Sequence, residues 1–204
     1  MKNFIQISDT EEEQVDKIKK WWNSNGKQII AGAVIGLAGV FGWNYYNDYQ
    51  DNQALNARTL YLNYASDSNN VGAYNKLIKE HPSSSYADQA TLLMAKYLFD
   101  AGSYSLALDV IKPLISNQSN IISSTAVLRV ASIYLQLGQH NEALSTLNIE
   151  SGEGFSGLIY NLTGDVYLDL GNSDEAKKYY LLAIENITEN SNLTQLIQIK
   201  LDDL

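Results

Sequence analysis

The sequence contains no cysteine and, in 204 residues, only two prolines and two histidines. Without cysteine the chain can form no disulfide, thiol-based active site, iron–sulfur site or lipid-modified N-terminal cysteine. Because Pro82 and Pro113 are its only prolines, helices meet few obstacles along the chain. His81 and His140 stand at predicted turns without partners at metal-ligand spacing, so we expect turn or capping roles for them and no metal site.

Basic residues are scarce in the C-terminal part of the chain. Residues 48–204 contain nine Lys/Arg and eighteen Asp/Glu, whereas residues 1–47 contain five of each. The net charge of −9 therefore belongs to residues 48–204, which have no basic stripe for nucleic acid. The carboxylates form no evident catalytic arrangement with a nucleophile or base. We interpret them as a solvated face and predict that the protein is not an enzyme and binds no cofactor.

One glycine motif matches a dinucleotide-binding pattern on paper. Gly152, Gly154 and Gly157 have the G-x-G-x-x-G spacing, but such a site requires a strand before the motif and a helix after it. In this sequence the motif falls between two predicted helices. We therefore expect a flexible loop there and no nucleotide site.

Twenty uncharged residues separate Lys27 from Asp48. At about 1.5 Å of rise per residue, a helix of this length crosses the roughly 30 Å hydrocarbon core of a bilayer. A cleaved signal would need small residues directly after the stretch, and a buried helix of a soluble domain would rarely have aromatic residues gathered at both ends. The flanking aromatic residues instead mark two membrane interfaces: Trp21, Trp22, Trp43, Tyr45, Tyr46 and Tyr49. The stretch therefore predicts a permanent membrane anchor.

Lysines predict the orientation of the anchor. Lys17, Lys19, Lys20 and Lys27 precede it, while Arg58 is the next basic residue after it. By the positive-inside rule the N-terminus stays in the cytoplasm. We therefore predict a cytoplasmic tail at 1–24, a transmembrane helix at 25–47 and a domain beyond the membrane at 48–204.

The tail and the anchor each carry a further pattern. In the tail, Ser8 with Glu11, or Thr10 with Glu13, predicts the start of a short amphipathic helix that rests on the membrane surface or makes a regulatory contact. In the anchor, three glycines share one helix face: Gly32, Gly36 and Gly39. Such a face favours close helix–helix packing, although glycine is also common in membrane helices.

Three segments of residues 48–204 repeat one pattern of helix, glycine turn and helix. Their equivalent positions are Ala95, Ala131 and Gly164; then Leu98, Tyr134 and Tyr167; then Gly102, Gly138 and Gly171; then Ala107, Ala143 and Ala176. Their offsets, 36 and 33 residues, bracket the tetratricopeptide period of about 34 residues. Residues 51–82 look like a degenerate fourth unit, and the ending LTQLIQIKLDDL predicts a capping helix. The predicted fold is all-α: a single transmembrane helix followed by a tetratricopeptide-like solenoid.

In the usual superhelix of such repeats, the first helix of each repeat lines an inner groove. The register places twelve residues there: Gln89, Leu92, Lys96 and Phe99; Thr125, Leu128, Ser132 and Leu135; Leu158, Asn161, Asp165 and Leu168. The leucines and Phe99 predict an apolar stripe without the cationic clamp that grips a peptide's terminal carboxylate. This groove would suit apolar segments of unfolded or partner chains. The alternative is that part of the stripe packs against neighbouring helices.

Several stretches resemble the YfgM family of ancillary SecYEG translocon subunits: EEEQVDKIKKWWNSNGK, GWNYYND, GEGF and IQIKLDDL. The resemblance covers nearly the whole chain. It implies a bacterial inner-membrane protein whose repeat domain is periplasmic and which associates with the Sec channel and with PpiD, a membrane-anchored chaperone of the peptidyl-prolyl isomerase type. It also implies assistance to secreted polypeptides as they emerge, and it brings no catalytic residues. The alternative function is a structural envelope scaffold, in division or outer-membrane assembly, that uses the same groove.

Overall fold

A computed structural model describes residues 11–67, 70–152, 154–187 and 192–204. Within these ranges every regular element is a helix, as the sequence predicts. The contacts divide the chain into two compact units, Met1–Leu55 and Asn56–Leu204, and each unit is described by itself below.

The first helix, α1, runs from Glu11 to Ser66 and contributes to both units. Its first turn consists of Glu11, Glu12 and Glu13, whose charges complement the positive end of the helix dipole. Ser8 and Thr10, the predicted caps, lie outside the described residues. The boundaries at 24/25 and 47/48 stay predictions, because they concern the position of a membrane and α1 continues through both.

In the first unit, α1 exposes its apolar side chains along the predicted anchor. This is the one helix of the described ranges that is long and apolar enough to cross a membrane, and none of its apolar window is buried. Ile35 and Phe41, for example, are 72% and 70% exposed. Exposing such an apolar surface to water costs free energy, so the lack of burial within the chain agrees with a helix surrounded by lipid.

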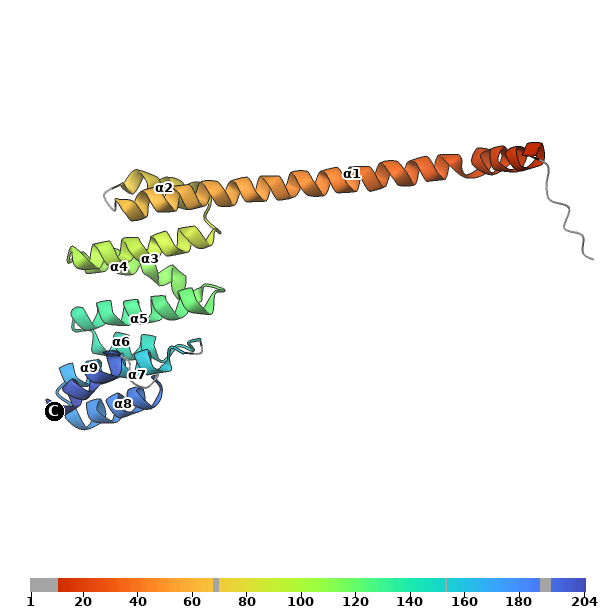
Figure 1. Cartoon of the computed structure of the whole chain (residues 1–204). Coiled ribbons are helices and arrows are strands. Elements are labelled where there is room, and N and C mark those ends of the chain that lie inside the picture. The colour runs from red at the N-terminus through yellow and green to blue at the C-terminus, as the bar shows by residue number, and fades with distance from the viewer. Residues whose placement is uncertain (1–10, 68–69, 153, 188–191) are drawn as a thin grey trace, which may run out of the picture. The chain divides into compact units, whose positions relative to one another are not determined.

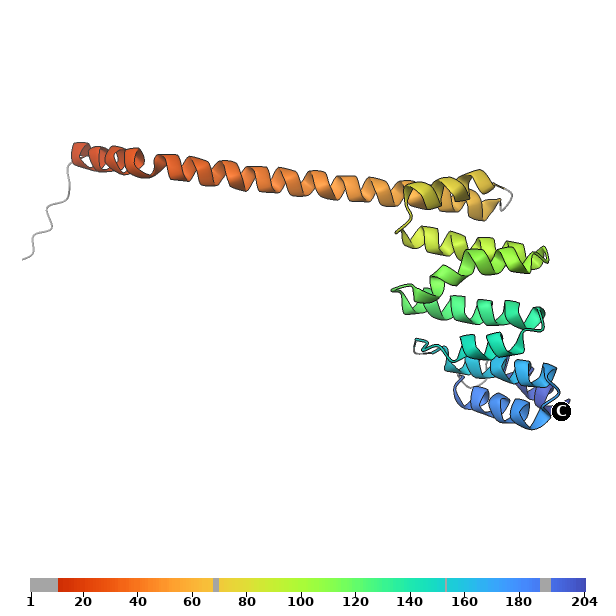
Figure 2. The ribbon, with the colours of Figure 1, turned by 180° about the vertical axis from the view of Figure 1, so that it is seen from behind.

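The second unit stacks helices in pairs, in chain order, as Figures 1 and 2 show from opposite sides. The last turns of α1 pair with α2, and the three repeats follow. The elements are α2 (Val71–Glu80), α3 (Ser85–Asp100), α4 (Tyr104–Ile111), the 3-10 helix η1 (Lys112–Ser116), α5 (Asn120–Gln136), α6 (His140–Leu147), α7 (Ser156–Asp169), α8 (Ser173–Glu185) and α9 (Asn192–Asp202). The predicted repeat units are therefore present in order, including the degenerate unit formed by α1 and α2.

A glycine ends the first helix of each repeat in the same way. Gly102, Gly138 and Gly171 have φ angles of 72°, 67° and 75°, in the left-handed region that side chains disfavour. The N–H of each glycine donates to the carbonyl three residues earlier, at 2.9 Å, and the next N–H donates to the carbonyl five residues earlier. This pair of bonds is the Schellman motif, which confirms the predicted glycine turns.

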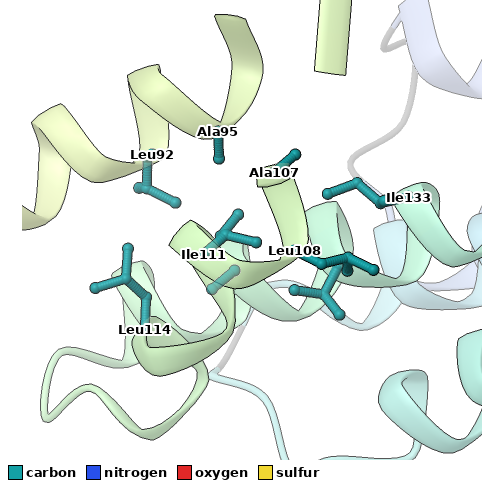
Figure 3. Packing of buried hydrophobic residues seen from close by; sticks show 9 residues of the cluster. Leu92, Ala95, Ala107, Leu108, Ile111, Leu114 and Ile133 are labelled. Atoms are coloured by element: carbon teal, nitrogen blue, oxygen red, sulfur yellow. The ribbon is translucent and has the colours of Figure 1, made fainter. Parts of the chain in front are cut away.

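Small residues allow the helices of each pair to pack closely. Ala95 of α3 and Ala131 of α5 are buried, as are the alanines of the second helices: Ala107, Ala143 and Ala176. Figure 3 shows Ala95 with Leu92, Ala107 and Ile111 in the core between α3, α4 and α5. In α7 the equivalent residue is Gly164, where an added Cβ would lie only 2.5 Å from the ring of the fully buried Tyr180. A tyrosine therefore fills the space that an alanine methyl group takes in the other repeats.

The C-terminal helix α9 caps the stack. Leu193, Ile197 and Leu201 pack beside Tyr180 at a spacing of four residues, which is one helix face. Leu196, which the sequence pattern places on the same side, is 49% exposed because it lies beyond the edge of that face. The predicted C-terminal helix is present, and of its four predicted apolar residues Leu196 faces outward.

The glycine motif at 152–157 connects α6 to α7. Gly152 donates its N–H to Ser124 Oγ of α5 at 2.8 Å, and an added Cβ at Gly157 would lie 2.4 Å from Ile187 Cγ1. Among the described residues, α6 ends at Leu147 before the motif, α7 begins at Ser156 within it, and no strand precedes it. Gly152 and Gly157 therefore permit close packing against Ser124 and Ile187.

Candidate functional site

The twelve predicted groove residues lie on α3, α5 and α7 and differ widely in exposure. Gln89, Lys96, Leu158 and Leu168 are exposed, whereas Leu92 is buried. The remaining seven are half-buried: Phe99, Thr125, Leu128, Ser132, Leu135, Asn161 and Asp165. The three first helices therefore present one mixed face, which we call the first-helix face.

Three leucines of the predicted stripe contribute to the core. Leu92 points toward Ile111 and Leu114 in Figure 3 and is only 9% exposed, so it does not line a groove. Leu128 and Leu135 pack against a buried cluster around Ala131 and Val166. The apolar stripe is therefore shorter than the sequence predicts, because contacts between adjacent repeats use part of it.

A hollow between α3 and α5 gathers three of the predicted residues. It has a volume of about 270 Å³ and is lined by Ala95, Lys96, Phe99, Asp100, Arg129, Ser132 and Ile133. We call it the α3–α5 hollow. Phe99 lies beside Tyr104 of α4, with 5.3 Å between ring centroids, which holds the ring at the edge of the hollow.

The charged groups of this hollow belong to two helices. On α3, Lys96 and Asp100 form an ion pair one helical turn apart. On α5, Arg129 donates from Nη1 to the carbonyl of Leu92 at 2.5 Å, and burial lowers the pKa of its guanidinium. Sequence reasoning missed Arg129 because the repeat register places it beside the predicted groove positions. Its signal was a lone charged residue within an otherwise uncharged helix.

A second hollow lies between α5 and α7. Its volume is about 740 Å³, and its lining residues are Leu135, Gln136, Gly138, Asp165, Leu168, Asp169 and Lys200. It brings together Leu135, Asp165 and Leu168 from the predicted set. We call it the α5–α7 hollow, and it is more polar than the first.

The capping helix supplies a cation to the α5–α7 hollow. Lys200 of α9 donates to Asp165 at 2.5 Å and to Asn161 at 3.1 Å. The hydroxyl of Tyr180 also donates to Asp165, at 2.7 Å, and burial together with this bond raises the pKa of Tyr180. Asn161 and Asp165 therefore hold α9 and α8 against α7, a role that the sequence pattern did not reveal because Lys200 lies in the C-terminal segment.

The histidine at the same end of the stack joins two repeats. His140 begins α6, and its Nε2 lies 2.6 Å from Asp169 Oδ2 at the end of α7. Within the described ranges no group of three or more His, Asp or Glu side chains is placed to hold a metal ion. His140 therefore has a structural contact at the predicted turn.

The glycine face of the predicted anchor has open space around it. A Cβ added at Gly32, Gly36 or Gly39 would meet nothing within 4 Å. No part of the described chain covers this face, so packing on it would have to come from another molecule.

Comparisons with known proteins agree with this architecture. Residues 19–204 match the tetratricopeptide repeat-like domain family. A protein of Aggregatibacter actinomycetemcomitans named "Ancillary SecYEG translocon subunit" is 36% identical over 200 residues, which cover 95% of this chain and 97% of the relative. Proteins of the same name from Haemophilus influenzae and Escherichia coli are 30% and 25% identical, covering 95% and 98% of this chain and 97% and 99% of the relatives. The chain therefore belongs to the YfgM family of ancillary SecYEG translocon subunits and contains a tetratricopeptide repeat-like domain.

Proposed function

We propose that this protein is an ancillary subunit of a SecYEG translocon in the bacterial inner membrane and acts as an interaction module, not as an enzyme. The near full-length similarity to proteins of that name carries the proposal. The exposed apolar stretch of α1 supports a single membrane crossing. The lysines before it support a cytoplasmic N-terminus and a periplasmic domain at 48–204.

The first-helix face is the surface we assign to polypeptide partners. Phe99, Leu158 and Leu168 offer exposed or half-exposed apolar contacts, and the two hollows interrupt the face between adjacent repeats. Helical-repeat domains use such extended surfaces for protein recognition. The partners we propose are secreted polypeptides as they emerge and the periplasmic chaperone PpiD.

The glycine face of α1 is the surface we assign to channel helices. Gly32, Gly36 and Gly39 leave room for a second helix backbone to approach closely. An interaction within the membrane would keep the repeat domain near emerging chains regardless of what the first-helix face binds.

Affinity purification of the full-length protein in mild detergent, with partners identified by mass spectrometry, tests the membrane part of the proposal. A matched variant replaces residues 28–47 with an unrelated membrane helix. We expect the native protein to recover SecYEG subunits and the variant to lose them. Recovery of division or outer-membrane assembly proteins with both versions, and of SecYEG with neither, would favour an envelope scaffold and contradict this proposal.

Photocrosslinking tests the first-helix face. A photoreactive amino acid replaces Phe99 or Leu168 in one set of variants, and Leu106 of α4 or Leu181 of α8 in a control set. All four side chains are apolar and accessible, but the controls lie on second helices. We expect crosslinks to secreted chains or to PpiD from Phe99 and Leu168 only. Equal crosslinking from both sets would contradict the assignment of polypeptide partners to the first-helix face.

A further inference from the structure

Arg129 occupies an unusual position on the first-helix face. It lies on α5, its side chain is half-buried, and its Nη1 donates across to the Leu92 carbonyl of α3. A guanidinium has five N–H groups arranged in a planar fork. The bond to Leu92 is the one hydrogen bond that this group makes within the described residues, so other N–H groups remain available at the α3–α5 hollow.

The charge of Arg129 is not balanced inside the hollow. Asp100, the acidic residue of the lining, pairs with Lys96. In the part of the chain that the structure describes, no carboxylate bonds to Arg129, and burial alone lowers its pKa. A half-buried cation without a counter-charge is unfavourable, and an incoming carboxylate would relieve that cost.

The remaining wall of the hollow is apolar. Ala95 and Phe99 come from α3 and Ile133 comes from α5, so an apolar surface adjoins the guanidinium. A volume of about 270 Å³ is below the roughly 300–1,000 Å³ of drug-sized pockets and suits one or two side chains. The hollow therefore offers one cationic contact beside one apolar contact.

We propose that the α3–α5 hollow binds a polypeptide segment in which an Asp or Glu side chain adjoins an apolar residue. The carboxylate pairs with Arg129, and the apolar side chain contacts Phe99 and Ile133. This inference rests on the proposed function, because it specifies which segments the first-helix face recognises. A chain terminus is the poorer ligand, since its carboxylate is usually gripped by several donors, and Lys96, the second cation of the lining, is paired with Asp100.

The contact acts at short range. Residues 48–204 carry twice as many acidic as basic residues, so their overall field does not steer acidic segments toward the face. The preference must then come from the fork geometry of Arg129, which matches a carboxylate with two parallel bonds. Lysine at this position would keep the charge and lose that geometry.

Peptide binding to the full chain in lipid nanodiscs tests the inference. The probe is a fluorescent peptide with a central Leu-Glu-Phe, blocked at both ends so that glutamate is its only carboxylate. The comparison peptide contains Gln in place of Glu. We expect the Glu peptide to bind about ten- to a hundredfold more tightly, as one charge-assisted pair contributes. In Arg129→Met this ratio should fall to about one, and Arg129→Lys should restore part of it.

Arg58→Met is the matched control, because it removes the other arginine of the chain from an exposed position on α1. It should leave the preference for Glu unchanged. The ratio is measured within each variant, so a partial loss of stability in Arg129→Met does not imitate the effect.

Three outcomes would overturn the inference. Equal binding of both peptides to the unchanged protein would show that the hollow does not prefer a carboxylate, without contradicting the assignment of the first-helix face to polypeptide partners. Tighter binding of a Gln peptide with a free C-terminus assigns the hollow to chain ends. If neither peptide binds and Phe99 and Leu168 give no crosslinks, the proposed function of the first-helix face is contradicted as well.

Discussion

The predicted anchor and the repeat domain use the same small and apolar residue types in opposite surroundings. A Cβ at Gly36 of α1 would meet nothing within 4 Å, while a Cβ at Gly164 of α7 would collide with the ring of Tyr180. Ile35 is 72% exposed, whereas Ile111, Ile133 and Ile197 are almost fully buried. The repeat domain supplies its own packing partners, and the anchor depends on lipid or on helices of other proteins.

Tyr180, which packs on Gly164, is one of the largest fully buried side chains of the repeat domain, so its loss should destabilise the domain strongly. Tyr180→Ala removes a fully buried ring and its bond to Asp165. We expect the free energy of unfolding to fall by about 3–5 kcal/mol, as for other large aromatic residues. Urea unfolding followed by circular dichroism measures it. The neighbouring Leu181→Ala, at a half-exposed position, should cost less than about 1 kcal/mol.

A charge placed in the predicted anchor tests whether that stretch of α1 lies in the membrane. Ile35→Arg should disfavour membrane insertion by about 2.5–3.5 kcal/mol, because arginine near the centre of a membrane helix is costly. The measured quantity is the fraction of protein that stays in membranes after alkaline extraction. Leu62→Arg, at an exposed position further along α1, should leave that fraction unchanged. An equal loss for both variants would contradict the predicted position of the anchor.

Gly164 of the repeat domain and Gly36 of the predicted anchor allow a direct comparison. Gly164→Ala gains about 1 kcal/mol of helix propensity but overfills the space beside Tyr180, so we expect a net loss of about 1–2 kcal/mol in unfolding free energy. Gly36→Ala should leave the unfolding of the repeat domain unchanged. If the glycine face packs on a channel helix, the bulkier Gly36→Leu should reduce recovery of SecYEG subunits.

The glycine turns should give the smallest effect. Gly171→Ala puts a side chain where φ is 75°, and we expect a loss of about 1 kcal/mol in unfolding free energy. Gly72→Ala in α2 has no positive φ, and its added Cβ would make an ordinary van der Waals contact with Asn70 Oδ1 at 3.7 Å, so it should stabilise the domain by about 0.5–1 kcal/mol. A loss of stability in Gly72→Ala would show that the two glycines do not differ as the backbone indicates.

Much of the fold was predictable because its signals are local. The turns at Gly102, Gly138 and Gly171 need only a residue that tolerates positive φ, and the alanines at the helix crossings follow from the repeat register. The capping helix followed from its spacing of apolar residues. Leu196 was misplaced, since periodicity alone does not define how wide the buried face is.

The candidate site was harder to predict because its contacts join distant segments. Leu92 fits the periodicity of a groove residue, yet the approach of η1 and α5 buries it in the core. Arg129 lies 37 residues from the carbonyl that it contacts, and Lys200 lies 35 residues from Asp165. No local pattern relates such pairs.

The sequence by itself determined the all-α class, the anchor-like stretch, the repeat register and the family resemblance. These depend on helix periodicity, on the length of an uncharged run and on glycine geometry, each of which acts over a few neighbouring residues. Only the tertiary structure decided which positions of the stripe stay accessible and which cation faces the α3–α5 hollow. Those outcomes depend on how closely adjacent repeats pack, and that distance is the result of all the side chains between them.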